Sequence, residues 1–191
     1  FVKLSFENII ENTISIQDYL KLKKSDIGIT TLPISYSYGM SVVNLHLFQD
    51  LKIISCKRSV FENKFWDLIK SYKVTNFSGV PASFEILDKI KFYNKEFFKI
   101  RFLTQAGGKL DEVLAKKIFT NLKKKKIDFY IMYGQTEASP RITFLETKYF
   151  LKKIGSVGKP IKGGKIKINK KRNVIGEIIY YGKNIFKGYA T

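Results

Sequence analysis

Cysteine and histidine are almost absent from this chain of 191 residues. The single cysteine, Cys56, has no second cysteine for an internal disulfide, and a zinc site built from several cysteines is excluded. The single histidine, His46, has no second ligand or base beside it in the sequence, so we interpret it as structural. No run of about 18 apolar residues occurs, which excludes a transmembrane helix, and no signal peptide is visible at the start. We therefore expect a cytoplasmic protein.

Arginine is also scarce, although the formal net charge is +19. Only four of the 35 basic residues are arginines. Basic surfaces bind nucleic acid by releasing counterions, but base readers and phosphate clamps depend on the bidentate guanidinium. The longest lysine run, at 123–126, follows a helical pattern, where cations complement the helix dipole. We expect no nucleic-acid partner, and a basic nucleic-acid binder stays as an alternative.

Hydrophobic residues make up 45% of the chain, enough to bury a sizeable core. Their spacing alternates between helical patterns and short apolar runs. The predicted helices are 6–22, which Ser5 caps, the segment after Gly39, 62–72, 81–91 and 110–124. The predicted strands are 26–33, 52–56, 74–77, 101–104 and 127–132.

Strands that alternate with helices of this length predict an α/β fold, with a layered, largely parallel sheet flanked by helices. The pattern changes after about Lys153, where glycines become frequent. Two strand-like runs, 165–169 and 177–181, follow there, joined by a polar turn at 170–173. We expect an α/β domain over 1–153 and the start of an antiparallel β subdomain over 154–191.

Three loops follow predicted strands, at 32–40, 104–110 and 132–137. Ligands bind at the carboxyl ends of parallel strands, and paired glycines allow a flat ligand to approach the backbone. We expect Gly107-Gly108 and Tyr133–Glu137 to lie side by side at the carboxyl edge of one sheet, because one predicted helix separates their strands. The third loop holds an aromatic ring, a glycine, a hydroxyl and a carboxylate, a set that suits a nucleotide with Mg²⁺. The alternatives are a plain turn for the glycine pair and a helix start for the Thr-Glu pair.

The order of several short motifs adds to this interpretation. They are Val80-Pro81-Ala82, Gln105-Ala106-Gly107-Gly108-Lys109-Leu110, Tyr133-Gly134-Gln135-Thr136-Glu137, Gly155-Ser156-Val157-Gly158-Lys159-Pro160, and Gly176-Glu177-Ile178 with Gly182 and Gly188-Tyr189. Through them the chain resembles, over essentially its whole length, the adenylate-forming superfamily of acyl-CoA synthetases, luciferases and peptide-synthetase adenylation domains. The resemblance implies the fold of an ATP-binding ligase.

The resemblance also implies roles for individual residues. Tyr133 would pack on adenine, with Gly107 and Gly108 on its other side, and Gly134 and Gln135 would belong to the same nucleotide-binding loop. Thr136 would donate a hydrogen bond to the α-phosphate and Glu137 would hold Mg²⁺, which makes these two the candidate catalytic residues.

The acid pocket is predicted around the first loop. Tyr36 stands where many members of the superfamily carry a histidine near the acyl carboxylate, and a tyrosine there cannot carry a positive charge at neutral pH. Tyr36, Tyr38 and Met40 are the candidates for shaping this pocket. An apolar loop packed into the core is the alternative for them.

The implied reaction joins a carboxylic acid to ATP with Mg²⁺ and passes the acyl group to CoA or to the thiol of an acyl carrier protein. The superfamily's phosphate loop would precede Val2, and its ribose-binding aspartate and carboxy-terminal lysine would follow Thr191. We therefore expect this chain to be the middle of a larger ligase, with little activity by itself. The alternatives are an amino-acid adenylation domain, although no acidic residue lies near 36–40, and a non-catalytic truncated remnant.

Overall fold

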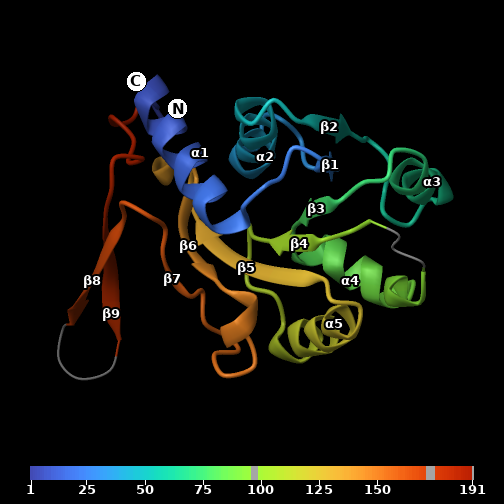
Figure 1. Ribbon diagram of the computed structural model, residues 1–191. Coiled ribbons are helices and arrows are strands. Elements are labelled where there is room, and N and C mark those ends of the chain that lie inside the picture. Colours follow the sequence, from blue (N-terminus) through green and yellow to red (C-terminus); the bar gives the residue numbers. More distant parts are fainter. Residues whose placement is uncertain (96–98, 171–174, 191) are drawn as a thin grey trace.

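One mixed β-sheet organises the part of the chain that the computed structural model describes, residues 1–95, 99–170 and 175–190 (Figure 1). Its strands are β1 (Ile27–Thr30), β2 (Lys52–Ser55), β3 (Asn76–Gly79), β4 (Phe102–Gln105), β5 (Asp128–Gly134), β6 (Arg141–Leu145) and β7 (Lys159–Pro160). They lie in the order β2-β1-β3-β4-β5-β6-β7, and the five strands from β2 to β5 are parallel. The predicted α/β class with a largely parallel sheet is confirmed.

Helices cover both faces of this sheet (Figure 1). On one face lie α1 (Phe6–Leu20) and α2 (Ser37–Phe48), and on the other lie α3 (Asn63–Ser71), α4 (Pro81–Lys89) and α5 (Glu112–Lys124). Consecutive strand residues point to opposite faces. On β4, accordingly, Phe102 belongs to the core under α1 and α2, whereas Leu103 belongs to the core under α3, α4 and α5.

The local sequence explains where α1 begins and ends. The Ser5 side chain accepts a hydrogen bond from the Asn8 backbone (3.2 Å), and the Asn8 side chain accepts one from the Ser5 backbone (2.9 Å). This reciprocal capping box satisfies two backbone donors at the helix start and confirms the predicted cap. The helix ends at Leu20, two residues before the predicted end, because Lys21 adopts a left-handed backbone conformation.

The carboxy-terminal third departs from the parallel pattern. β6, which periodicity did not predict, runs antiparallel to β5, and β7 runs antiparallel to β6. A separate antiparallel pair follows, formed by β8 (Lys165–Lys170) and β9 (Gly176–Tyr181). Lys170, the first residue of the predicted turn at 170–173, is the last residue of β8, and the rest of that turn lies outside the described residues. The division of the chain at residue 153 stays a prediction.

Among the described helices, none combines the length and the apolar character needed to cross a bilayer.

Candidate functional site

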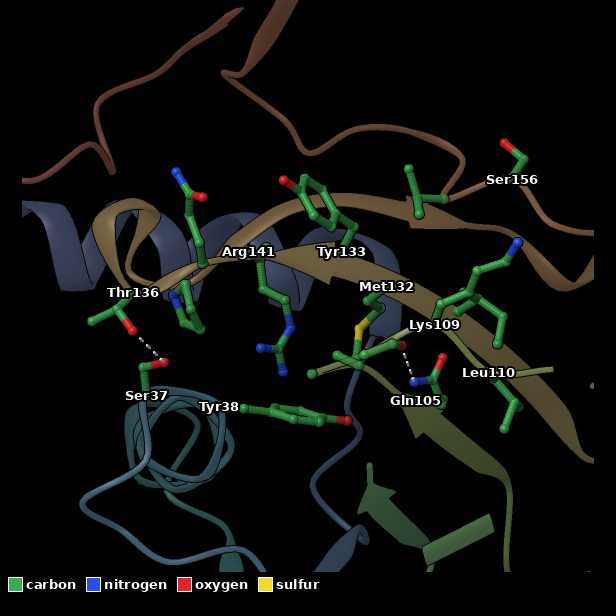
Figure 2. Close-up of a pocket in the computed structure, with 18 of the residues that line it drawn as sticks. Ser37, Tyr38, Gln105, Lys109, Leu110, Met132, Tyr133, Thr136, Arg141 and Ser156 are labelled. Atoms are coloured by element: carbon green, nitrogen blue, oxygen red, sulfur yellow. Dashed lines mark hydrogen bonds between the residues drawn. The ribbon is translucent and has the colours of Figure 1, made fainter. Parts of the chain in front are cut away.

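A cavity of about 610 Å³ opens at the carboxyl ends of β4 and β5 (Figure 2). β4 and β5 are parallel neighbours, with Gln105 opposite Ile131 in their register, so the loops that follow them lie side by side. This confirms the prediction that the glycine pair and the Tyr133–Glu137 loop share one edge of the sheet. The cavity is lined by segments 36–38, 105–110, 131–137, 140–141 and 155–157, together with Glu112 and Ala115.

The glycine pair forms a tight turn against the first loop. Gly107 has a positive φ of 83°, and a Cβ atom there would lie 2.5 Å from the Tyr36 hydroxyl. Any side chain would therefore be strained by its backbone and blocked by the tyrosine ring. The buried Gln105 side chain secures the turn, because its Nε2 donates to the Gly108 carbonyl over 2.9 Å. Gly107 and Gly108 thus present backbone without side chains to the cavity that they line.

Gly134 is required for a different reason. A Cβ atom at this position would lie 1.7 Å from the Pro140 carbonyl oxygen. The chain after β5 folds back on itself through a short 3₁₀ turn, Thr136–Ala138, before β6 begins. The helix start that was the alternative for the Thr-Glu pair is therefore only this single turn.

Thr136 and Glu137 each have a partner from a distant segment. The Thr136 hydroxyl donates to Ser37 Oγ at the start of α2 over 3.1 Å (Figure 2). The Tyr189 hydroxyl donates to Glu137 Oε1 over 2.9 Å, and this hydrogen bond to a carboxylate raises the pKa of Tyr189. The backbone N–H of Phe186 donates to the Glu137 carbonyl over 2.8 Å. The end of the described chain therefore borders the loop.

The three predicted acid-pocket residues do not all reach the cavity. Tyr36 and Tyr38 line it, whereas Met40, two residues after Tyr38 on α2, is not among its lining residues. Tyr38 is 2% exposed, and its Oη lies 2.9 Å from Thr104 Oγ1 and 3.1 Å from the Thr104 carbonyl oxygen. Burial raises the pKa of Tyr38, although the nearby charge of Arg141 works against this.

Arg141 is the main feature of the cavity that sequence reasoning missed. It is the first residue of β6, is 3% exposed, and its guanidinium carbon lies 4.2 Å from the centroid of the Tyr38 ring. Figure 2 shows its side chain extending from β6 toward Tyr38, between Thr136 and Gln105. The only signal in the sequence was an arginine directly before the β-branched pair Ile142-Thr143 in an otherwise lysine-rich chain, and that signal does not distinguish a buried site from a surface position.

The residues present fit a nucleotide with Mg²⁺. Tyr133 is half-buried at the cavity and offers a ring for packing, while Thr136 and Ser37 offer hydroxyl groups. No cluster of three or more His, Cys, Asp or Glu side chains suited to a metal occurs within the described ranges. Mg²⁺ is commonly held by one or two carboxylates together with substrate phosphates. A single carboxylate such as that of Glu137 would therefore be enough on the protein side for a metal shared with a nucleotide.

A family model and individual relatives of known name agree on the family to which this chain is similar. The family model described as "AMP-binding enzyme" matches residues 1–190. The chain is 29% identical over 192 residues to the 2-succinylbenzoate–CoA ligase of Geobacillus sp. (strain WCH70), covering 97% of this chain and 38% of that protein. It is 26% identical over 195 residues to the oxalate–CoA ligase of Saccharomyces cerevisiae, covering 100% of this chain and 35% of that protein.

A solved structure gives the same result at the level of the fold. The o-succinylbenzoate CoA synthetase of Bacillus subtilis in complex with ATP and magnesium ion matches with a TM-score of 0.85 and 24% identity. The match covers 98% of this chain and 39% of that one. The chain thus spans between 35% and 39% of the length of these three proteins.

Proposed function

The chain belongs to the AMP-binding enzyme family, and from this premise we propose that it forms the nucleotide- and acid-binding part of an AMP-forming acid–thiol ligase. In the proposed reaction a carboxylate oxygen attacks the α-phosphorus of ATP, forming an acyl adenylate and releasing pyrophosphate. A thiol of CoA or of a carrier protein then attacks the acyl carbon and releases AMP. One observation carries the proposal: the glycine turn after β4 and the Tyr133–Glu137 loop after β5 line one cavity.

On this proposal, the two loops divide the binding of the nucleotide. Tyr133 packs against adenine, and the backbone of Gly107 and Gly108, which carries no side chains, approaches the other side of the ring. Gly134 and Gln135 form the turn that brings Thr136 toward the α-phosphate. Without a side chain at Gly134 this turn closes against Pro140, so the position of Thr136 follows from that close approach.

Charge stabilisation is the chemical role of Thr136 and Glu137. Negative charge builds on the α-phosphate oxygens as the carboxylate attacks, and a fixed hydroxyl donor lowers the energy of that state. Thr136 is held by Ser37 before any ligand binds, which reduces the reorganisation needed. Glu137 would hold Mg²⁺, which supplies positive charge beside the phosphates.

Tyr36 and Tyr38 would border the acid, while Met40 would act only through the packing of α2. An amino-acid adenylation domain needs a negative group near the substrate ammonium. The charged group buried in this cavity is instead a cation, Arg141, so the geometry favours an acid without an ammonium group.

The test is acid-dependent exchange of labelled pyrophosphate into ATP, measured on the polypeptide that contains this chain with a broad panel of carboxylic acids. We expect exchange with at least one acid and a loss of about 100-fold in Thr136→Val. Thr120→Val is the matched control, because Thr120 is an exposed residue of α5 whose hydroxyl bonds only within that helix. Absence of exchange with every acid, or equal rates in Thr136→Val and the wild type, would refute the proposal and favour the non-catalytic alternative.

A further inference from the structure

The guanidinium of Arg141 is buried without an opposite charge. None of the ion pairs within the described ranges includes Arg141, and its Nε has no hydrogen-bond partner there. Arg101 shows the contrast, because its guanidinium is paired with Asp26. Arginine remains protonated inside proteins, and an unpaired buried charge is costly. The folded chain therefore maintains an unfavourable positive charge at the cavity.

The surrounding structure keeps this charge in place. Two buried asparagines form hydrogen bonds with the Arg141 backbone. Asn12 Nδ2 and Asn184 Nδ2 donate to the Arg141 carbonyl over 3.1 and 2.9 Å. The Arg141 backbone N–H donates to Asn12 Oδ1 over 3.4 Å. The Tyr38 ring supports the guanidinium from below. The position of the cation is thus set before a ligand arrives.

No acidic side chain of the described protein neutralises Arg141 from behind. A second, very small cavity of about 10 Å³ lies on that side, lined by Ser41, His46, Asn76, Ser78 and Thr104 among others, with no carboxylate. Its volume allows at most one water molecule. On the main cavity, Glu112 is paired with Lys109, and Glu137 accepts from Tyr189. None of the carboxylates that line the main cavity forms an ion pair with Arg141, so an anionic ligand bound there would supply the missing counter-charge.

The position of Arg141 separates it from the residues proposed to hold adenine. Figure 2 shows Tyr133 pointing to the opposite side of the β5–β6 pair from Arg141, while Arg141 and Met132 point toward Tyr38. Tyr36 and Tyr38, the proposed neighbours of the acid, line the same cavity as Arg141. The cation consequently faces the part of the cavity assigned to the acid.

We propose that Arg141 binds a second carboxylate of the acid substrate, so that this site takes dicarboxylic acids. The proposal rests on the proposed ligase function and adds its substrate class. A hydrocarbon tail would leave the guanidinium desolvated and unpaired, and an ammonium group would be repelled by it. A carboxylate matches its donors in a bidentate geometry. One carboxylate then reacts with ATP while the other pairs with Arg141.

The first experiment compares acids of equal carbon number, succinate against butyrate, glutarate against pentanoate and adipate against hexanoate, by pyrophosphate exchange. We expect at least one diacid to exceed its monoacid about tenfold or more in kcat/KM, and Arg141→Met to remove that preference with the KM for ATP unchanged. Arg141→Lys keeps the charge without the planar fork and should retain part of the preference. Arg58→Met, at an exposed ion pair with Glu62 between β2 and α3 and outside the cavity lining, is the matched control.

The second experiment makes the result independent of catalysis. Without ATP, at least one of the three diacids should raise the melting temperature of the wild type and of Arg58→Met but not of Arg141→Met. If no acid supports exchange, the proposed function fails, and this melting shift still decides the role of Arg141. A monoacid preference, equal losses for both acids in Arg141→Met, or a melting shift that Arg141→Met loses only for ATP or inorganic phosphate would each overturn the proposal. Equal losses of exchange activity with the diacid and the monoacid would assign Arg141 to the reacting carboxylate. A melting shift lost only for ATP or inorganic phosphate would assign Arg141 to the nucleotide.

Discussion

The hydroxyl of Thr136 donates to Ser37 Oγ over 3.1 Å, linking two loops that lie 99 residues apart in the sequence. One loop follows β5 and the other begins α2. Because Ser37 stands beside Tyr36 and Tyr38, this hydrogen bond connects the proposed phosphate contact with the proposed acid pocket. Movement of either loop would shift the other.

Ser37→Ala should slow adenylate formation without abolishing it. The Thr136 hydroxyl would lose the partner that orients it, a change of about 0.5–1.5 kcal/mol or about 2–12-fold in rate. In a Thr136→Val background the same substitution should add little, because the hydroxyl that Ser37 orients is already gone. Pyrophosphate exchange rates for the four proteins give the coupling directly. Fully additive losses would show that Ser37 acts independently of Thr136.

Glu137→Gln should impair the metal dependence of the reaction more than the fold. The variant keeps the size of the side chain and still accepts a hydrogen bond from Tyr189, but it lacks the charge that Mg²⁺ demands. We expect turnover to fall at least about tenfold and the Mg²⁺ requirement to rise, with a loss in unfolding free energy of about 1 kcal/mol or less. Exchange rates across a Mg²⁺ titration and a urea denaturation curve measure the two effects. Glu85→Gln, at an exposed position of α4, is the control. A normal Mg²⁺ dependence would limit Glu137 to its contact with Tyr189.

Arg101→Met should destabilise the fold strongly at neutral pH. The Asp26 carboxylate is fully buried, and removing Arg101 leaves it without its ion-pair partner, which costs about 3–5 kcal/mol. Urea denaturation at pH 7 measures the loss. Arg58→Met, at an exposed pair with Glu62, should cost about 1 kcal/mol or less. A loss in Arg101→Met no larger than in this control would show that Asp26 is satisfied by its other hydrogen bonds.

The same ion pair predicts a pH dependence. Burial acts to raise the pKa of Asp26, but hydrogen bonds from Arg101, the Lys23 backbone and Thr75, with the charge of Arg101, hold it below its ordinary value. A depressed carboxyl pKa contributes stability that is present above the unfolded pKa, about 4, and is lost as the pH falls through the folded pKa. The stability gap between the wild type and Arg101→Met should therefore narrow below about pH 4. A gap that stays constant from pH 7 to pH 3 would contradict this assignment.

Gly28→Ala should be destabilising because of His46. A Cβ atom at Gly28 would lie 2.3 Å from His46 Nε2, inside a packed region where His46 is 1% exposed. Overpacking of this kind costs about 1–3 kcal/mol. In a His46→Ala background the imidazole is gone, and the cost of Gly28→Ala should fall below about 0.5 kcal/mol. Urea denaturation of the four proteins tests this, and an equal cost in both backgrounds would place the strain elsewhere.

The local sequence alone predicted the alternation of helices and strands and the loops that form the site. These predictions depend on interactions between residues close in sequence, so they need no knowledge of the fold. Examples are the cap at Ser5, the proline in the first turn of α4 and the spacing of apolar residues. The prediction that the glycine pair and Tyr133–Glu137 meet at one sheet edge was confirmed for a related reason. Parallel strands joined by one helix place their carboxyl ends together.

Only the tertiary structure decided which side chains meet in the cavity. β6 was missed because an antiparallel return after a short 3₁₀ turn depends on the close contact of Gly134 with Pro140, which no periodicity encodes. Met40 was predicted to shape the acid pocket together with Tyr36 and Tyr38, and the helical rotation of α2 places it outside the lining of this cavity. The packing of Arg141 on Tyr38 and the pairing of Thr136 with Ser37 join segments that lie far apart in the sequence. Contacts over such separations are set by how the sheet and its helices pack, and the sequence by itself determined only the residues available to make them.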